Sequence, residues 1–256
     1  MAEKNQVKTL EKCVHVLTCM ADNLEPMTLN ELIKKTGLKK TTTYRLLQAL
    51  TSLQLMEKNP ETKQYHLGPK LIYFGVTALG NLDLHKISLP IMTKLRNDTG
   101  ETINLSILKG SEIIILARIR SDHLFNVNLS VGSRLPVNCT SQGKVILAYM
   151  NDDRANEIME NFIFEKKTEK TIVSMSALKN ELELVREKGY AVNDEELEKG
   201  LSAVAAPIFN YAGEVIAAIN VSYSTARHPE PEMYKRFSKK VITASKKISK
   251  SIGFSG

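Results

Sequence analysis

Tryptophan is absent from this sequence, and cysteine is scarce. The three cysteines (Cys13, Cys19 and Cys139) form no CxxC pair, which argues against a disulfide framework and a structural zinc site, and we expect a reducing cytoplasm as the compartment. No apolar run approaches the roughly 18 residues that span a bilayer, and the first six residues hold no apolar stretch typical of a secretory signal. The sequence therefore predicts neither a membrane protein nor a secreted one.

Clustered metal ligands are also missing. The five histidines are scattered along the chain without an i, i+4 pair and without a neighbouring set of carboxylates and cysteines. We therefore expect no metal and no other cofactor. What is present is an ordinary globular composition, 43% hydrophobic and 25% charged, in 256 residues, a length that suits two domains.

The net charge of +7 is distributed unevenly. Residues 71–232 are acidic on balance, whereas residues 233–256 carry seven lysines and arginines and no acid. Between Glu31 and Glu57 there is no acid, and this stretch holds five cations (Lys34, Lys35, Lys39, Lys40 and Arg45). Such a segment can bind phosphates, although a basic run is also common on a solvent-exposed face.

Helical spacing predicts three helices in the first 53 residues. Apolar residues recur at helical intervals over residues 6–21. Thr28 and Glu31 fit a capping box for a second helix that ends at Gly37, and Thr41 or Thr42 can cap a third helix that runs to about residue 53. In the third helix one stripe is suited to burial (Thr43, Leu46, Leu47 and Leu50), and the opposite face is polar (Thr41, Tyr44, Arg45 and Gln48).

Two short strands, at residues 55–58 and 64–67, follow around a turn at residues 59–63. Three helices and a hairpin in this order form a winged helix-turn-helix, whose third helix is placed to enter a major groove. The motif is followed by a mostly apolar helical segment over residues 70–79, a break at residues 81–84, and a further helix over residues 87–96 that is entered through Pro90.

The second half of the chain has a different pattern. β-Branched runs form two hairpins, and helices lie between and after them, which predicts an α+β fold with an antiparallel sheet. The expected strands are residues 102–108, 112–119, 203–209 and 214–222, and the expected helices are residues 142–150, 177–188 and 233–252.

Several stretches together resemble the isocitrate lyase regulator (IclR) family of transcription factors. Residues 37–47 (GLKKTTTYRLL) and 65–68 (YHLG) resemble its winged helix. Residues 132–136 (GSRLP) with 141–144 (SQGK), 189–197 (GYAVNDEEL) and 200–207 (GLSAVAAP) resemble its effector domain. The resemblance implies a DNA-binding domain at residues 1–68, a linker and dimerisation helix at residues 69–84, and a GAF-like domain for effector binding and oligomerisation at residues 85–256. It also implies a homodimer or a dimer of dimers.

The residues expected to contact DNA lie on the third helix and the wing. They are Lys39, Lys40, Thr41, Thr42, Tyr44, Arg45, Gln48, Lys58 and Lys63. By the resemblance, polar contacts to an effector fall on Ser141, Gln142, Asn193, Asn220 and Ser222, with Ala203 beside them and an apolar wall of Leu124, Val127, Leu135 and Leu201. Family members often carry an acid where Asn193 stands and a cysteine where Ala203 stands.

The physical chemistry of these residues favours an anionic effector. Ser141 and Gln142 open a predicted helix, whose free N–H groups attract a carboxylate. Asn220 and Ser222 are two apart on a strand and so share a face. We therefore expect a transcriptional regulator, more specifically a repressor, that binds an operator and a small carboxylate effector such as a keto acid or a sugar acid.

Other interpretations have less support. Gly143-Lys144 lacks the remaining glycine and hydroxyl residue of a phosphate-binding loop. The acids at 194–196 and 198 are expected to be solvated, as consecutive acids on a loop usually are, and no nucleophile accompanies them to indicate catalysis. Cys139 is expected to be a small buried side chain. The C-terminal basic helix is expected to pack through its apolar stripe, with auxiliary DNA contact as the second choice.

The alternative to a regulator is a small-molecule-binding or catalytic α+β domain whose N-terminal helices only mediate association. Because no catalytic set is found, we expect no enzymatic activity.

Overall fold

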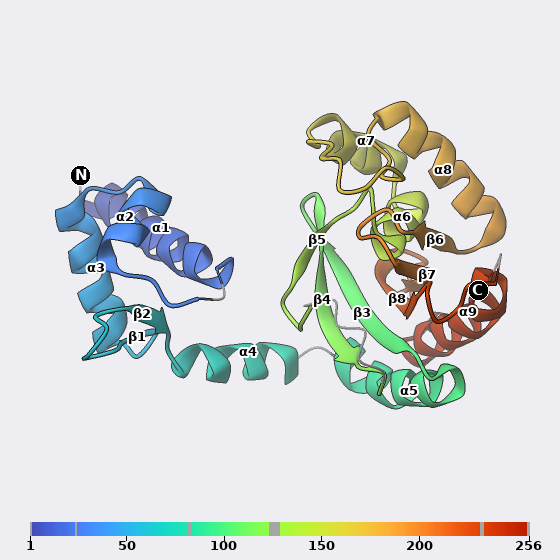
Figure 1. The fold of residues 1–256 in the computed structure, drawn as a ribbon, viewed down its shortest axis with the longest axis horizontal. Helices are drawn as coiled ribbons and strands as arrows, with labels where there is room; N and C mark the ends of the chain where they lie inside the picture. Colours follow the sequence, from blue (N-terminus) through green and yellow to red (C-terminus); the bar gives the residue numbers. More distant parts are fainter. Residues whose placement is uncertain (1, 24, 81–82, 123–128, 231–232, 255–256) are drawn as a thin grey trace. The chain divides into compact units, whose positions relative to one another are not determined.

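The computed structural model describes residues 2–23, 25–80, 83–122, 129–230 and 233–254 (Figure 1). The chain divides into two compact units, an N-terminal unit of residues 1–81 and a C-terminal unit of residues 82–256. The division falls inside the predicted linker. Within the described residues no helix is both long enough and apolar enough to cross a membrane.

The N-terminal unit has the predicted winged helix-turn-helix architecture. Its core joins the three helices to the hairpin through buried side chains that include Val16, Leu32, Leu47 and Tyr65. The elements are α1 (Ala2–Ala21), α2 (Leu29–Thr36), α3 (Lys40–Ser52), the antiparallel strands β1 (Met56–Lys58) and β2 (Tyr65–Leu67), and the following helix α4 (Lys70–Gly80).

Local signals set both ends of α2 as the sequence predicts. The Glu31 carboxylate accepts from the Thr28 backbone N–H at 2.7 Å, the Thr28 side chain accepts from Glu31 N–H, and Gly37 adopts a left-handed conformation with φ of 68°. The predicted cap of α3 at Thr41 or Thr42 is wrong. The helix already begins at Lys40, since Lys39 is extended after a tight connection, and its side chain makes no capping bond.

The C-terminal unit contains a six-stranded antiparallel sheet in the order β5-β4-β3-β8-β7-β6. Both predicted hairpins form, and they meet where β3 pairs with β8 at the centre of the sheet. The strands are β3 (Thr102–Lys109), β4 (Glu112–Ile119), β5 (Arg134–Pro136), β6 (Ala191–Asp194), β7 (Leu201–Phe209) and β8 (Val215–Ser224).

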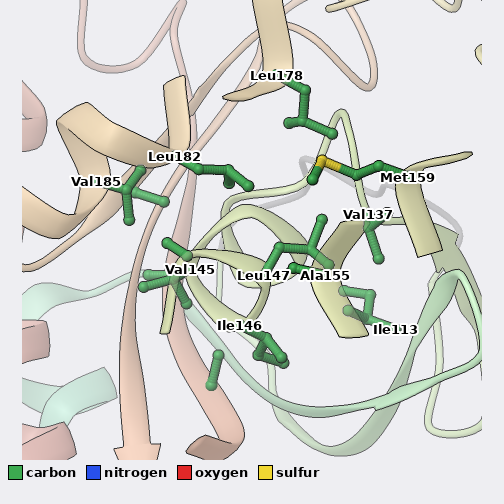
Figure 2. Packing of buried hydrophobic residues seen from close by; sticks show 14 residues of the cluster. Ile113, Val137, Val145, Ile146, Leu147, Ala155, Met159, Leu178, Leu182 and Val185 are labelled. Carbon is green, nitrogen blue, oxygen red and sulfur yellow. The ribbon is translucent and has the colours of Figure 1, made fainter. Parts of the chain in front are cut away.

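Helices cover both faces of this sheet. On one face, α5 (Asp83–Thr99) packs against α9 (Met233–Ser251), and both contact the strands. On the other face lies α6 (Ser141–Tyr149), itself covered by α8 (Met175–Lys188). Figure 2 shows the core here, where Val145, Ile146 and Leu147 of α6 belong to one buried cluster with Leu182 and Val185 of α8.

Helix α6 is buried along nearly its whole length, from Ser141 to Ala148. Gly143 makes this close packing possible, because a Cβ at that position would lie 2.4 Å from the Val137 Cα. A larger residue cannot be accommodated without moving the backbone. The glycine therefore allows the helix to pack closely, which agrees with the finding that the sequence around it does not match a phosphate-binding loop.

Some elements differ from the sequence-based expectation. Helix α5 begins at Asp83, so Pro90 lies inside the helix rather than at its entry, and only residues 81–82 separate it from α4. The strands β5 and β6 and the helix α7 (Asp152–Glu160) were not expected. The two strands have only three and four residues, too few to show alternation, whereas α7 does carry a recognisable cap, Asn151.

Candidate functional site

The polar face of α3 is exposed as predicted. Thr43, Leu46, Leu47 and Leu50 are buried, while Thr41, Tyr44, Arg45 and Gln48 point to solvent. The Gln48 side-chain amide donates to the Tyr44 hydroxyl at 2.9 Å, which holds the two side chains together one turn apart. Lys39 and Lys40 are exposed at the start of the helix, and Thr42 is half-buried. The helix therefore presents hydrogen-bonding groups and cations on one side.

The wing is a tight turn between β1 and β2. The Asn59 side chain accepts from the backbone N–H groups of Glu61 and Thr62, at 2.8 and 3.0 Å, and Lys63 takes a left-handed φ of 59°. The ammonium of Lys63 donates to the Pro60 carbonyl at 2.5 Å, and that of Lys58 lies 5.3 Å from the centroid of the Tyr65 ring. Both lysines are exposed. The turn thus places two positive charges at the wing.

A small cavity in the C-terminal unit, here called the Asn220 cavity, brings together the effector residues expected from the resemblance. It encloses about 20 Å³, room for about one water molecule. Its lining includes Leu135, Ser141, Gln142, Asn193, Leu201, Ala203, Asn220 and Ser222. Residues from α6, β6, β7 and β8 meet there. Two further members of the expected apolar wall, Leu124 and Val127, lie outside the described residues.

The start of α6 faces this cavity. The helix begins at Ser141, one residue before the expected position, and Thr140 caps it by accepting from Gly143 N–H at 3.2 Å. The Ser141 hydroxyl is buried, and no described residue hydrogen-bonds to it. A helix start carries N–H groups without intrahelical partners and a partial positive charge. This end of the cavity is therefore suited to an anion.

The side-chain amides around the cavity are oriented by the protein itself. The Asn220 oxygen accepts from the Asn104 side-chain amide at 2.8 Å, and the Asn193 oxygen accepts from Glu196 N–H at 2.8 Å. The Asn220 oxygen also accepts from the Asn104 backbone N–H at 3.3 Å and is fully occupied, whereas the Asn193 oxygen keeps one lone pair. The Nδ2 groups of both residues are the available donors. Gln142 is different, because its Nε2 donates to two sheet carbonyls, those of Asn104 and Ala218, at 3.2 Å each. Gln142 therefore ties α6 to the sheet.

A chain of hydrogen bonds leads to Asn220 from a half-buried cation. Arg118 Nη1 donates to the Asn104 oxygen at 3.1 Å, and Asn104 in turn donates to Asn220. Burial lowers the pKa of Arg118, with Arg120 as a secondary cause. Because each donor in such a chain polarises the next, the guanidinium strengthens Asn220 as a donor toward the cavity.

Sequence reasoning missed both Asn104 and Arg118. The available signal was that Asn104 and Arg118 are polar residues within the mostly apolar runs 102–108 and 112–119. A polar side chain that is buried in such a strand needs a hydrogen-bond partner. Ile115, Leu129, Thr140 and Leu197 also line the cavity and were not expected. No motif singles out these four residues.

The expectation that the acids after Asn193 are solvated is wrong for Glu196. Glu196 is 6% exposed, and it accepts from the ammonium of Lys144 at 2.6 Å. Lys144 is itself 1% exposed and also contacts Glu181 at 3.1 Å. The physical reason is that Lys144 follows Gly143 on the buried helix α6 and needs a carboxylate there. Asp194 and Glu198 are exposed, as expected.

Two further expectations concern the side chain of Cys139 and the packing of helix α9. Cys139 is fully buried, and burial raises the pKa of its thiol to about 12, which confirms a small buried side chain. Helix α9 packs through a buried stripe that includes Phe237, Val241 and Ile248, which confirms its packing role. Most of its cations are exposed, and Lys240 donates to the Asp98 carbonyl at 2.5 Å.

Comparisons with known proteins match both units. A family model described as "IclR helix-turn-helix domain" matches residues 9–60, and one described as "Bacterial transcriptional regulator IclR C-terminal" matches residues 76–250. The chain is 33% identical over 252 residues to the "HTH-type transcriptional regulator KdgR" of Escherichia coli, covering 98% of this chain and 95% of that protein. It is 29% identical over 250 residues to the "Transcriptional repressor IclR" of the same organism, covering 97% and 91%. A crystal structure of an IclR transcriptional regulator from Alicyclobacillus acidocaldarius has a TM-score of 0.83 at 25% identity and covers 96% of this chain and 97% of that one.

Proposed function

The chain belongs to the IclR family of bacterial transcriptional regulators, and from this premise we propose that it is a repressor whose operator affinity is controlled by a small organic acid. Proteins of this family regulate transcription and are not enzymes. The DNA site proposed for this chain is the polar face of α3 with the wing. The effector site proposed for it is the Asn220 cavity.

The proposed DNA-binding role is supported mainly by the amphipathic character of α3. One face of the helix is buried in the domain core, and the other leaves Tyr44, Arg45 and Gln48 free to reach base edges. Arginine and glutamine side chains can form paired hydrogen bonds to guanine and adenine in the major groove. The proposed phosphate contacts are the exposed lysines Lys39 and Lys40 at the start of the helix, and Lys58 and Lys63 in the wing.

The amide donors of the Asn220 cavity support an acid as the effector. Asn193 and Asn220 both offer side-chain N–H groups, which pair with carboxylate or carbonyl oxygens, and the Asn220 oxygen is already occupied by Asn104. The start of α6 adds a positive partial charge on the same side. A keto acid or a sugar acid supplies both a carboxylate and further oxygens. Because the cavity encloses only about 20 Å³, such a ligand has to widen it on binding.

A homodimer, or a dimer of dimers, is part of the proposal. Exposed apolar side chains on α1 (Leu10 and Val14) and α4 (Ile72, Tyr73 and Phe74) support association through these helices. A dimer of winged helices reads two half-sites of an operator. Repression is supported by the name of the relative described as a transcriptional repressor.

The test of the DNA site is the double variant Arg45→Ala/Lys40→Ala. Loss of Arg45 should cost about 1–3 kcal/mol of binding to the specific operator if it reads a base edge. Loss of Lys40 should mainly flatten the salt dependence, because a phosphate contact releases counterions. Fluorescence anisotropy with labelled DNA from upstream of the protein's own gene measures both effects.

The matched control is Lys246→Ala/Lys247→Ala, which removes two exposed cations from α9 and should leave operator binding unchanged. Undiminished operator affinity in a folded Arg45→Ala/Lys40→Ala protein would contradict the assignment. The same result would favour the alternative in which the N-terminal helices only mediate association.

A further inference from the structure

A second and larger cavity lies in the C-terminal unit, between α8, β6 and the first residues of α9. It encloses about 590 Å³, within the range of small-molecule sites, and is called here the Tyr234 cavity. Three tyrosines line it, Tyr190, Tyr223 and Tyr234. Five carboxylates line it as well (Glu181, Asp194, Glu195, Glu196 and Glu230), against a single lysine, Lys188.

The carboxylates of the Tyr234 cavity are only partly neutralised from outside it. The buried Lys144 is shared between Glu181 and Glu196, and Lys170 is shared between Asp194, at 2.9 Å, and Glu195, at 3.8 Å. His228, which also lines the cavity, is paired with Glu101 at 2.8 Å instead. The walls therefore carry more negative than positive charge.

Glu196 gives a second and independent observation, a carboxylate whose Oε1 pairs with Lys144 while its Oε2 has no donor among the described residues. It lines the cavity although more than nine-tenths of it is buried, and its Oε2 accepts no hydrogen bond from any described residue. A buried carboxylate oxygen without a donor is costly, and a ligand N–H group that reached it would remove that cost.

The tyrosines favour an organic cation as the ligand of the cavity. The rings of Tyr190 and Tyr234 lie 6.4 Å apart, and Tyr223 is nearly buried at the inner end. Aromatic faces attract organic cations, since the ring quadrupole is negative above the plane. A bare metal ion is a poor fit, because in the described part of the chain no three histidine, cysteine or carboxylate side chains converge as metal ligands.

We propose that the Tyr234 cavity binds a small organic cation with two ammonium groups, of the diamine class. One ammonium pairs with Glu181 and Glu196, and the alkyl chain and the other ammonium lie against the tyrosines. The site communicates with the Asn220 cavity through one loop, because Glu196 lines the larger cavity while its N–H donates to Asn193 and its neighbour Leu197 lines the smaller one. A bound diamine therefore fixes the position of Asn193.

Calorimetry at constant ionic strength tests the proposal with 1,4-diaminobutane, butylamine and the uncharged 1,4-butanediol. The expected order of affinity is diamine, then monoamine, then diol. Tyrosine emission gives a second readout, because three of the eight tyrosines line the cavity and no tryptophan obscures them. No DNA is used, so failure here leaves the proposed regulatory function untouched.

Two variant pairs locate the site. Glu181→Gln should weaken diamine binding about tenfold, as for loss of a charged hydrogen bond, whereas Glu183→Gln, on the same helix but outside the cavity, should not. Tyr234→Leu should weaken it about threefold, whereas the exposed Tyr211→Leu should not. Circular dichroism checks folding, and if Glu181→Gln does not fold, the tyrosine pair decides.

Three results would overturn the proposal. The first is a diol that binds as tightly as the diamine. The second is an equal effect of the cavity variants and their controls. The third is stoichiometric displacement of the diamine by Mg²⁺, which would indicate a metal site instead.

Discussion

Single amide groups determine what the Asn220 cavity can recognise. Asn104 occupies the oxygen of Asn220, and the backbone N–H of Glu196 binds one lone pair of the Asn193 oxygen, so we expect these side chains to act toward a ligand mainly as donors. Their arrangement was not predictable from the sequence, since an isolated asparagine can donate or accept equally well. The resemblance named residues that line one cavity, but only the partners Asn104 and Arg118, which lack a motif, show the direction of the hydrogen bonds.

Asn220→Ala should weaken binding of an acid effector by about 1–3 kcal/mol, because a ligand oxygen loses its donor in a partly buried site. Operator affinity without ligand should be unchanged. Calorimetry against pyruvate and gluconate, with their uncharged amides for comparison, measures the effect, and Asn180→Ala on the exposed face of α8 is the control. Equal binding of acids and amides, or wild-type affinity in Asn220→Ala, would show that the cavity assignment is wrong.

Lys144 is a buried charge whose removal should affect stability in a pH-dependent way. Burial raises the pKa of Glu196 above its ordinary value, even though Lys144 counteracts the shift. A raised carboxyl pKa means that the contribution of Glu196 to stability is full below the unfolded-state pKa and is lost as the pH rises through the folded-state pKa. Removing Lys144 enlarges this loss, because Glu196 is then ionised without its closest cation.

Lys144→Met should therefore lower the free energy of unfolding by about 3–5 kcal/mol at pH 7.5, and by less at pH 5. Urea unfolding at the two pH values measures the difference. Lys144→Met/Glu196→Gln should recover part of the loss, since the unpaired carboxylate is gone. An equal loss at both pH values, or no recovery in the double variant, would contradict this role of the pair.

Among the elements, most of those with strong periodicity or caps were predictable, although α7 with its Asn151 cap was missed, and the short strands were not predictable. The capping box of Thr28 and Glu31, the stripe of α3 and the two long hairpins were all visible in the sequence. The start of α3 was misplaced because Thr41 and Thr42 both offered plausible caps, whereas the tight connection after Gly37 decides the start. The short strands β5 and β6 exist because the neighbouring strands β4 and β7 offer free edges, which is tertiary information.

The wing should contribute affinity but no sequence preference. Lys58→Gln/Lys63→Gln should weaken binding to the operator and to unrelated DNA by the same factor and reduce the slope of the salt dependence by about two phosphate contacts. Anisotropy titrations at several salt concentrations measure this, with Lys246→Ala/Lys247→Ala again as the charge control. A selective loss of operator binding would mean that the wing reads bases.

At the scale of the whole molecule, the chain combines a basic winged helix with a sheet domain, and two of the cavities in this domain have opposite preferences. The Asn220 cavity offers N–H donors and a helix start, whereas the Tyr234 cavity offers carboxylates and aromatic faces. Family resemblance predicted the two-part architecture and the first cavity, because both depend on motifs in the sequence. The second cavity depends on residues from α8, β6, β8 and α9 that carry no common motif, so only the fold brings them together.

The central claim is that a small acid bound at Asn220 controls operator affinity. Its most direct test is the dissociation constant for the upstream DNA, measured by anisotropy with and without pyruvate or gluconate, in the wild-type protein and in Asn220→Ala. We predict that at least one acid shifts the wild-type constant, that its uncharged amide does not, and that the shift is lost in the variant. An unchanged wild-type constant with every acid, or the same shift in Asn220→Ala, would contradict the account.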